Sequence, residues 1–366
     1  MNIETFTVSC DKVLHHGWPD VTAASDGTLV CVFSECTSHC VRPYTRIMFC
    51  RSTDEGRTWS PKEPLNEGTA ELPFYWNCPR ISTMPDGRVV IIVDRIPRSG
   101  EEGGACNAEN LLYTSHDNGK TWSAGTLLPL KGIVPDKYRF LNNNRLATAA
   151  HYALEKTLTQ FLRYSDDNGA TWSEPVTVAH DDTHHFCEVS LLPMGGETVV
   201  ALMRENSGMG YDCFKAISAD NGATWSEPVP FPIPGCHRPA AGFLKDGRIL
   251  ITYRFHQGGL CGKGNGAQNF FGALTDRASL LADTRQGAAV RIFPIDYDRS
   301  PKADTGYSGW VQLPDNSIYA VNYIVDDAVT HGQIRGYRIT LEDLLIDSPL
   351  KRCALCNCPK EFCHRY

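Results

Sequence analysis

The nine-residue stretch STDEGRTWS at residues 52–60 decides the fold, because the same pattern occurs three more times along the chain. The further copies read SHDNGKTWS (115–123), SDDNGATWS (165–173) and SADNGATWS (218–226). The aspartates of successive copies are 63, 50 and 53 residues apart, at Asp54, Asp117, Asp167 and Asp220. A repeat with a period of this length indicates a propeller or another array of similar units.

A second repeat supplies the number of units. A polar turn followed by an apolar strand occurs six times, at residues 25–33, 85–93, 142–150, 194–202, 245–253 and 314–322. Each copy carries the Asp, Asn or Gly signal of a β-hairpin between two β-prone runs. Helical periodicity is confined to two short segments, 277–283 and 340–347. We therefore predict an all-β, six-bladed propeller over residues 1–345, followed by a Cys-rich tail at 346–366.

The repeated turn is expected to be structural. Its glycine suits a position with positive φ, and its Asp, Ser and Thr side chains can bind backbone N–H groups within the turn. Its tryptophan offers a large apolar surface, which we expect to be buried between neighbouring blades. A catalytic site needs one asymmetric set of groups, whereas the four aspartates recur at blade spacing. We do not expect these aspartates to be catalytic.

Composition excludes several classes of protein. The 366 residues are 42% hydrophobic and 21% charged, and no apolar run is long enough for a membrane span. The net charge of −7, without a cluster of Lys or Arg, argues against a nucleic-acid partner. The start of the chain lacks the basic and apolar regions of a signal peptide, which favours the cytoplasm. Composition specifies no oligomeric state.

The fifteen cysteines predict two different environments. In a chain without an export signal, most should be reduced, buried, small hydrophobic residues. The tail has the C-x2-C spacing of a zinc knuckle, with ligand types at Cys353, Cys356, Cys358, Cys363 and His364. A second matched knuckle is missing, so a Cys-rich tail without zinc is the simpler expectation.

Two further patterns are expected to be loops, and we expect neither a cofactor nor a metal in the functional site. His184 and His185 are adjacent, so on a strand they would point to opposite faces. The Gly-rich segment 258–273 lacks the spacing of a phosphate-binding loop. We expect the histidines to lie at the rim of the propeller and the Gly-rich segment to cross its mouth.

Polar residues recur where the inner strand of each block would meet the central channel. Counting back seven residues from the hairpin Gly or Asn gives Asp20, Arg80, Lys137 and Glu188, and counting back nine gives Arg238 and Tyr307. The returning strands end at Glu35, Arg95, Tyr152, Arg204, Arg254 and Tyr323. Strand alternation alone would not place a polar residue at the same point of every block. The ring predicts a binding funnel, and its arginines indicate an anionic ligand such as a carboxylate.

The segment GYSGWVQLPDNSIYAVNY (306–323) resembles the last-blade segment of the sialidase (neuraminidase) superfamily of Asp-box propellers. The resemblance implies that Tyr307 is a nucleophile and that Glu188 activates it. It also implies that Arg204 and Arg238 bind a carboxylate. A tyrosine suits this role, because a sugar with a carboxylate on its anomeric carbon would repel a carboxylate nucleophile. The phenol, with a pKa of about 10, needs the glutamate to take its proton.

The chain departs from the family pattern in its first and last blades. The first-blade Arg-Ile-Pro is GWP here (17–19), the last-strand Tyr-Glu is NYI (322–324), and the loop CTSHCVRPYT (36–45) contains no aspartate. The missing arginine and its missing carboxylate partner are consistent with each other, since the carboxylate alone would be an uncompensated charge. By resemblance the general acid is then Glu35 or Asp20, and Arg80 replaces the lost arginine.

The resulting expectation is a sialidase-like hydrolase that removes a terminal acidic sugar through a tyrosine nucleophile. Catalysis is assigned to Tyr307, Glu188 and one of the two acids. Substrate binding is assigned to Arg80, Arg204, Arg238, Arg254, Arg95 and Tyr323. Two alternatives stay open: a non-catalytic glycan-binding propeller, and a uronate-processing lyase on the same scaffold.

Overall fold

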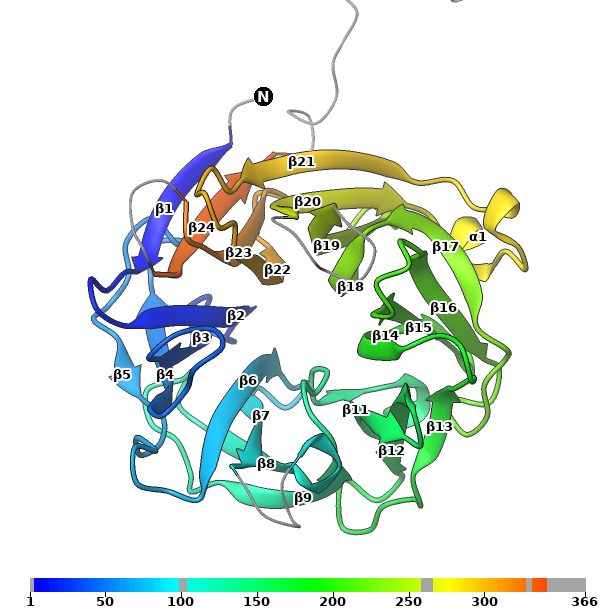
Figure 1. Ribbon diagram of the computed structural model, residues 1–366, viewed down its shortest axis with the longest axis horizontal. Coiled ribbons are helices and arrows are strands. Elements are labelled where there is room, and N and C mark those ends of the chain that lie inside the picture. The colour runs from blue at the N-terminus through cyan, green and yellow to red at the C-terminus, as the bar shows by residue number, and fades with distance from the viewer. Residues whose placement is uncertain (1–2, 99–103, 258–265, 327–330, 341–366) are drawn as a thin grey trace, which may run out of the picture.

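The structure is a computed structural model that describes residues 3–98, 104–257, 266–326 and 331–340. Within these ranges the strands form six four-stranded sheets around a common centre, as Figure 1 shows. The expected six-bladed β-propeller is therefore confirmed. The Cys-rich tail at 346–366 and nearly all of the expected helix at 340–347 lie outside the described residues, as do residues 258–265 of the Gly-rich segment.

Each blade is an antiparallel sheet that runs from the centre outward. Blade 1 comprises β2 (His15–Ala23), β3 (Leu29–Cys36), β4 (Thr45–Ser52) and β5 (Glu63–Pro64). Blade 2 comprises β6 (Phe74–Thr83), β7 (Val89–Pro97), β8 (Glu109–Ser115) and β9 (Thr126–Lys131). Blade 3 comprises β10 (Arg139–Phe140), β11 (Leu146–Leu154), β12 (Thr157–Ser165) and β13 (Val176–Ala179). Blade 4 comprises β14 (Phe186–Gly195), β15 (Thr198–Glu205), β16 (Asp212–Ser218) and β17 (Val229–Pro234). Blade 5 comprises β18 (Cys236–Phe243), β19 (Ile249–Gln257), β20 (Ala267–Thr275) and β21 (Arg291–Tyr297).

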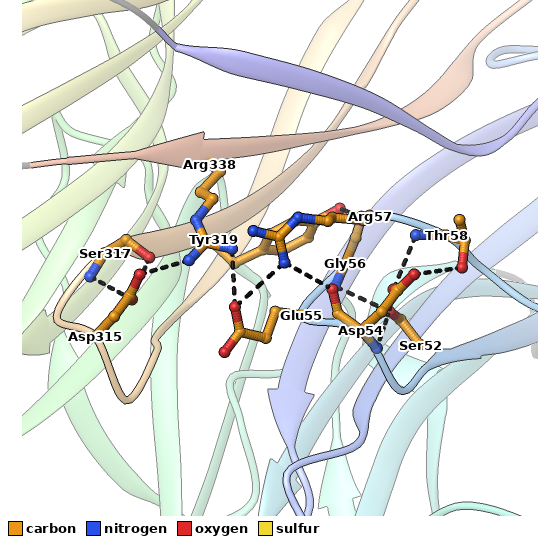
Figure 2. Close-up of polar contacts among 10 residues, drawn as sticks. All are labelled: Ser52, Asp54, Glu55, Gly56, Arg57, Thr58, Asp315, Ser317, Tyr319 and Arg338. Carbon is orange, nitrogen blue, oxygen red and sulfur yellow. Dashed lines mark hydrogen bonds and ion pairs between the residues drawn. The ribbon is translucent and has the colours of Figure 1, made fainter.

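Blade 6 joins the two ends of the described chain. It comprises β22 (Thr305–Gln312), β23 (Ile318–Ile324), β24 (Gln333–Ile339) and, as its outer strand, β1 (Glu4–Ser9). The β1–β24 pairing closes the ring without leaving β24 as a free edge. Figure 2 shows a second closing contact, in which Arg338 donates to Glu55 of blade 1 at 2.9 Å and to Asp315 at 2.5 Å.

Helices are few in the described part of the chain. The helix expected at 277–283 is present as α1 (Arg277–Leu281). Short 3-10 turns occur at Ala105–Asn107, Asn142–Asn144 and Arg285–Gly287. In the described ranges no helix combines the length and the apolar character that a membrane crossing requires.

The repeated turn has the structural role that its residues predict. In the first copy the Ser52 hydroxyl accepts from the Gly56 N–H at 2.9 Å, and Gly56 has a φ of 86°. The Asp54 carboxylate accepts from the Thr58 N–H at 2.9 Å and from its hydroxyl at 2.6 Å (Figure 2). The other three copies repeat these bonds. The aspartates are therefore used in holding their own turns.

The turns also join neighbouring blades through their tryptophans. The ring of Trp59 lies 6.0 Å from that of Tyr319 in blade 6, and the ring of Trp122 lies 5.7 Å from that of Phe49 in blade 1. Tyr319 also donates its hydroxyl to the carbonyl of Gly56 at 2.9 Å. These contacts confirm that the turn tryptophans pack between blades.

The described cysteines fit the expectation of reduced residues in the core. All ten in the described ranges are free, and seven of them are buried: Cys31, Cys36, Cys50, Cys78, Cys187, Cys213 and Cys236.

Candidate functional site

The inner strand of each of four blades has a β-bulge at which one non-glycine residue adopts a positive φ. The register shifts between Gly17 and Asp20, Cys187 and Ser190, His237 and Ala240, and Gly306 and Gly309. The first bulged residue has a positive φ of 55°, 53°, 51° or 53°, respectively at Trp18, Glu188, Arg238 and Tyr307. This conformation costs a non-glycine residue about 1 kcal/mol or more, so the fold maintains it against strain. We call these four residues the bulge ring; Figure 1 shows their strands around the centre.

Two members of the bulge ring contact each other directly. The Tyr307 hydroxyl donates a short hydrogen bond to Oε1 of Glu188. The same oxygen accepts from Nη1 of Arg204 at 2.8 Å, and Arg204 also donates to Oδ1 of Asn206. Tyr307 is 7% exposed and Glu188 is 4% exposed. The structure thus brings a buried phenol, a carboxylate and a guanidinium into one hydrogen-bonded group.

The charges of this group keep the glutamate ionised and the phenol protonated. Burial raises the pKa of Glu188, but Arg204 and Arg254 outweigh burial, and the pKa falls to about 2. Burial and the Glu188 carboxylate raise the pKa of Tyr307, whereas Arg204 and Arg254 lower it. In this state Glu188 is therefore the ionised acceptor of the phenolic hydrogen bond, and the pKa of Tyr307 is raised overall even though the two arginines favour the phenolate.

Two more arginines lie over the Tyr307 ring. The guanidinium carbons of Arg254 and Arg80 are 5.2 Å and 5.9 Å from the ring centroid. Arg254 donates to the Thr305 carbonyl at 3.4 Å and contacts Nδ1 of His237 at 3.1 Å. Both arginines keep a buried nitrogen without a hydrogen-bond partner among the described residues, Nε of Arg254 and Nη2 of Arg80. These nitrogens are available to an anion.

Glycine at position 306 permits the approach of Arg254. A Cβ on Gly306 would lie 2.6 Å from Cβ of Arg254, and the φ of 129° disfavours any other residue. We expect Gly306→Ala to destabilise the protein by roughly 2–4 kcal/mol in urea denaturation. The matched control is Gly195→Ala, which has φ of 87° but nothing within 4 Å of the added Cβ, and should cost about 1 kcal/mol. Equal losses for the two variants would contradict the proposed contact.

Arg238 and Asp20 line a small cavity. Arg238 donates to the carbonyls of Val189 at 2.7 Å and Pro135 at 2.8 Å. Asp20 accepts from two backbone N–H groups, those of Val21 and Ile81, and pairs with Lys137 at 3.0 Å. The cavity has a volume of about 130 Å³, and its lining includes Asp20, Arg80, Lys137, Arg139 and Arg238. Asp20 is fully buried and held by these donors, so it is poorly suited to release a proton to a leaving group.

Glu35 is committed to another cluster. Its carboxylate accepts from Nζ of Lys62, from Nε2 of His16 at 3.1 Å and from the hydroxyl of Tyr44 at 2.9 Å. Burial raises the pKa of Glu35, but these hydrogen bonds more than offset burial and lower the pKa to about 2. A general acid must carry its proton near the working pH. Glu35 is therefore no better suited to that role than Asp20.

The two remaining predicted residues have other partners. Arg95 pairs with Glu109 on the adjacent strand at 2.6 Å and lies 4.8 Å from the centroid of Phe74. Tyr323 is fully buried and donates its hydroxyl to Asp304 at 2.7 Å. Its ring lies 6.5 Å from that of Tyr307. Tyr323 therefore packs near the nucleophile candidate, whereas Arg95 forms an ion pair within its own blade.

A cation that the sequence reasoning missed lies over the first bulge position. The guanidinium carbon of Arg42 is 4.1 Å from the centroid of Trp18, the middle residue of the GWP triplet that stands where the family has Arg-Ile-Pro. Arg42 donates to Oδ1 of Asn77 at 2.6 Å, and Arg98 binds its carbonyl at 2.7 Å. Arg42 lies in a loop without repeats, so spacing could not reveal it. The tryptophan in GWP was its only sequence signal.

The sequence matches the family described as BNR repeat-like domain over residues 75–318, which is more than half of the chain. The chain belongs to the BNR repeat-like family. This membership confirms the expected relationship to the Asp-box propellers of the sialidase superfamily.

Individual relatives of this BNR repeat-like protein are distant. A protein named sialidase from Paraclostridium sordellii is 25% identical over 214 residues, which cover 49% of this chain and 52% of the relative. The match thus spans about half the length of that relative. A structure of unknown function from Dyadobacter fermentans has a TM-score of 0.73 at 21% identity, covering 92% of this chain and 98% of the other. The intramolecular trans-sialidase of Ruminococcus gnavus, solved with oseltamivir carboxylate, has a TM-score of 0.63 at 15% identity, covering 91% and 96%.

Proposed function

We propose that this BNR repeat-like propeller hydrolyses the glycosidic bond of a terminal sugar that carries a carboxylate on its anomeric carbon. The observation that carries the proposal is the buried hydrogen bond from Tyr307 to Glu188, whose carboxylate is kept ionised by its ion pair with Arg204. Tyr307 attacks the anomeric carbon and Glu188 takes its proton. Hydrolysis of the tyrosyl intermediate then releases the sugar with retained configuration.

The substrate carboxylate is assigned to the arginines that keep free donors beside the nucleophile. Arg80 and Arg254 have unpartnered nitrogens and lie over the Tyr307 ring. Arg42 adds a third cation over Trp18. Arg204 also keeps an unpartnered Nε, but it pairs with Glu188, and both Nη atoms of Arg238 donate to carbonyls. We therefore assign these two arginines mainly to holding the site together.

A comparison of two fluorogenic glycosides tests this assignment. One is a sialoside and the other its carboxamide, which has the same shape without the charge. We expect turnover of the sialoside at a kcat/KM at least about a hundredfold above that of the amide, because two charge-assisted contacts are lost. Arg254→Leu should narrow that ratio. Equal turnover of acid and amide would contradict an arginine-held carboxylate, and no turnover of either, or of related 2-keto acidic glycosides, would contradict the hydrolase.

A non-catalytic glycan-binding propeller is the second candidate. It is favoured by the partners of the two predicted acids, since Asp20 pairs with Lys137 and Glu35 pairs with Lys62. Such a protein would bind an acidic sugar in calorimetry and release no free sugar during long incubation. The arginine cluster would serve binding alone.

A further inference from the structure

A histidine–aspartate pair lies beside the bulge ring and is used by none of the roles assigned above. Nδ1 of His39, in the loop between β3 and β4, contacts both carboxylate oxygens of Asp304, at 2.9 Å and 2.8 Å. Burial raises the pKa of Asp304, but its contacts with His39 outweigh burial and lower it to about 2. The carboxylate can therefore only accept, so Nδ1 of His39 carries the shared proton. This leaves Nε2 as the atom that exchanges a proton with its surroundings.

The pair is connected to the nucleophile candidate through one intervening ring, that of Tyr323. The His39 ring lies 5.1 Å from that of Trp18 in the bulge ring and 6.3 Å from that of Tyr323. Tyr323 in turn lies 6.5 Å from Tyr307 and donates to Asp304. The side chain of His39 is 35% exposed, and it lines two open hollows of about 490 Å³ and 1120 Å³. His39 is therefore accessible to a group that enters either hollow from solvent.

The loop is held in place by a second set of contacts. Nε of Arg42 donates to the His39 carbonyl at 2.7 Å, and Arg98 binds the carbonyls of Arg42 and Pro43, each at 2.7 Å. The position of His39 thus depends on blades 1, 2 and 6 together. A proton donor fixed in this way needs little reorganisation before it acts.

A metal site is the other use that these groups suggest. Single ligand atoms of His15, His39 and Asp304 lie within 4.8 Å of one another. However, Nδ1 of His15 accepts from the Gly332 N–H at 3.0 Å, so the neutral ring carries its proton on Nε2 and has no lone pair there for a metal. Both oxygens of Asp304 are already occupied by His39 and Tyr323. These contacts favour proton transfer over metal binding.

We propose that His39, positioned by Asp304, is the general acid of the hydrolysis proposed above, on which this assignment rests. Nε2 of the imidazolium gives its proton to the leaving oxygen as the glycosidic bond breaks. At the same time the Tyr307 oxygen forms its bond to the anomeric carbon, and the phenolic proton passes to Glu188. In the second step neutral His39 takes a proton from water, the water oxygen replaces Tyr307 on the sugar, and Glu188 returns the proton to the phenolate.

The groups that face His39 come from several elements. They are His15 and Trp18 of β2, Arg42 of the same loop, Tyr323 of β23 and Asp304 before β22. The larger hollow is also lined by Asp11, Lys12, Lys302, Asp326 and His331. Asp304 is the carboxylate that contacts the ring, so it is the group expected to stabilise the imidazolium.

Leaving-group dependence tests the proposal. A 4-nitrophenyl glycoside departs without protonation, whereas a sialyl-lactose leaving group requires it. His39→Asn keeps a donor for Asp304 and removes the acid. We expect it to lower kcat/KM at least about a hundredfold for the sugar leaving group and less than about tenfold for nitrophenol. Asp304→Asn should give a smaller loss that is again selective for the sugar leaving group. EDTA should change neither rate.

The matched control is His184→Asn. His184 also pairs with an aspartate, Asp181, at 2.6 Å, but it packs against Phe186, Tyr211 and Phe214 in blade 4. Neither substrate should be affected by that change. Suppose the wild type cleaves both glycosides. If His39→Asn then lowers kcat/KM equally for both glycosides, or for neither, His39 is not the acid. A wild type that cleaves neither would overturn the proposed hydrolase and this assignment with it.

Discussion

Replacing Tyr307 with phenylalanine is expected to lower kcat on an acidic glycoside at least about a thousandfold. The hydroxyl is the atom that would form the bond to the sugar, and the structure places it against the Glu188 carboxylate. The aromatic ring stays, so the packing of Arg80 and Arg254 over it should persist. Binding of a carboxylate ligand, measured by calorimetry, should therefore change by less than about tenfold.

The matched control is Tyr319→Phe. Tyr319 is also fully buried, and its hydroxyl donates to the Gly56 carbonyl at 2.9 Å rather than to any residue of the bulge ring, in the contact between blades 6 and 1. This change should cost about 1 kcal/mol of stability and leave kcat intact. Retention of more than a tenth of the activity by Tyr307→Phe would contradict a tyrosine nucleophile.

Removing the Glu188 carboxylate should have the largest effect on stability. Arg204 is 13% exposed at its side chain, and its guanidinium depends on Glu188 for charge compensation. Burial lowers the pKa of Arg204, but the glutamate outweighs burial and raises it. We therefore expect Glu188→Ala to cost about 3–5 kcal/mol in urea denaturation, since it leaves a buried, unpaired cation.

The double variant Glu188→Leu/Arg204→Met separates charge from packing. It removes both charges and keeps most of the volume, so most of the lost stability should return. Glu188→Gln tests the chemical role, because it keeps the shape but cannot take the proton, and its kcat should fall about 10²–10⁴-fold. A double variant as unstable as Glu188→Ala would show that the pair does not stabilise the fold through its charges.

The propeller fold was predictable because the signals that encode it are local. Turn residues such as Ser52, Asp54 and Gly56 specify their hydrogen bonds within a few residues, and the structure reproduces those bonds in all four copies. The pairing of Tyr307 with Glu188 was implied by the family resemblance. The hydrogen bond from Arg204 to Glu188 was not predicted, because the resemblance assigned Arg204 to a ligand carboxylate.

It was harder to predict which residue of each inner strand belongs to the bulge ring, because a bulge has no sequence signal of the kind that marks a turn. Arg238 and Tyr307 stand nine residues before their hairpin Gly or Asn, and the same count in blade 1 gives Trp18 rather than Asp20. Glu188 stands only seven residues before its glycine because its hairpin is tighter. There Gly195 pairs with Thr198, whereas in blade 1 Ala23 pairs with Leu29. Counting seven residues in blade 1 therefore selected a residue below the bulge ring.

The loop residues were beyond sequence reasoning for a different reason. His39 and Asp304 are 265 residues apart and meet only because blade 6 closes against blade 1. No repeat or motif connects them.

The most direct test of the tyrosine mechanism is mass spectrometry of the protein after incubation with a fluorinated acidic sugar fluoride, whose glycosyl–enzyme intermediate hydrolyses slowly. The account predicts a mass increase of one sugar, located by peptide sequencing on Tyr307 and absent from Tyr307→Phe. A label on Glu188 or another residue, or an unlabelled protein that still cleaves the natural substrate, would contradict it.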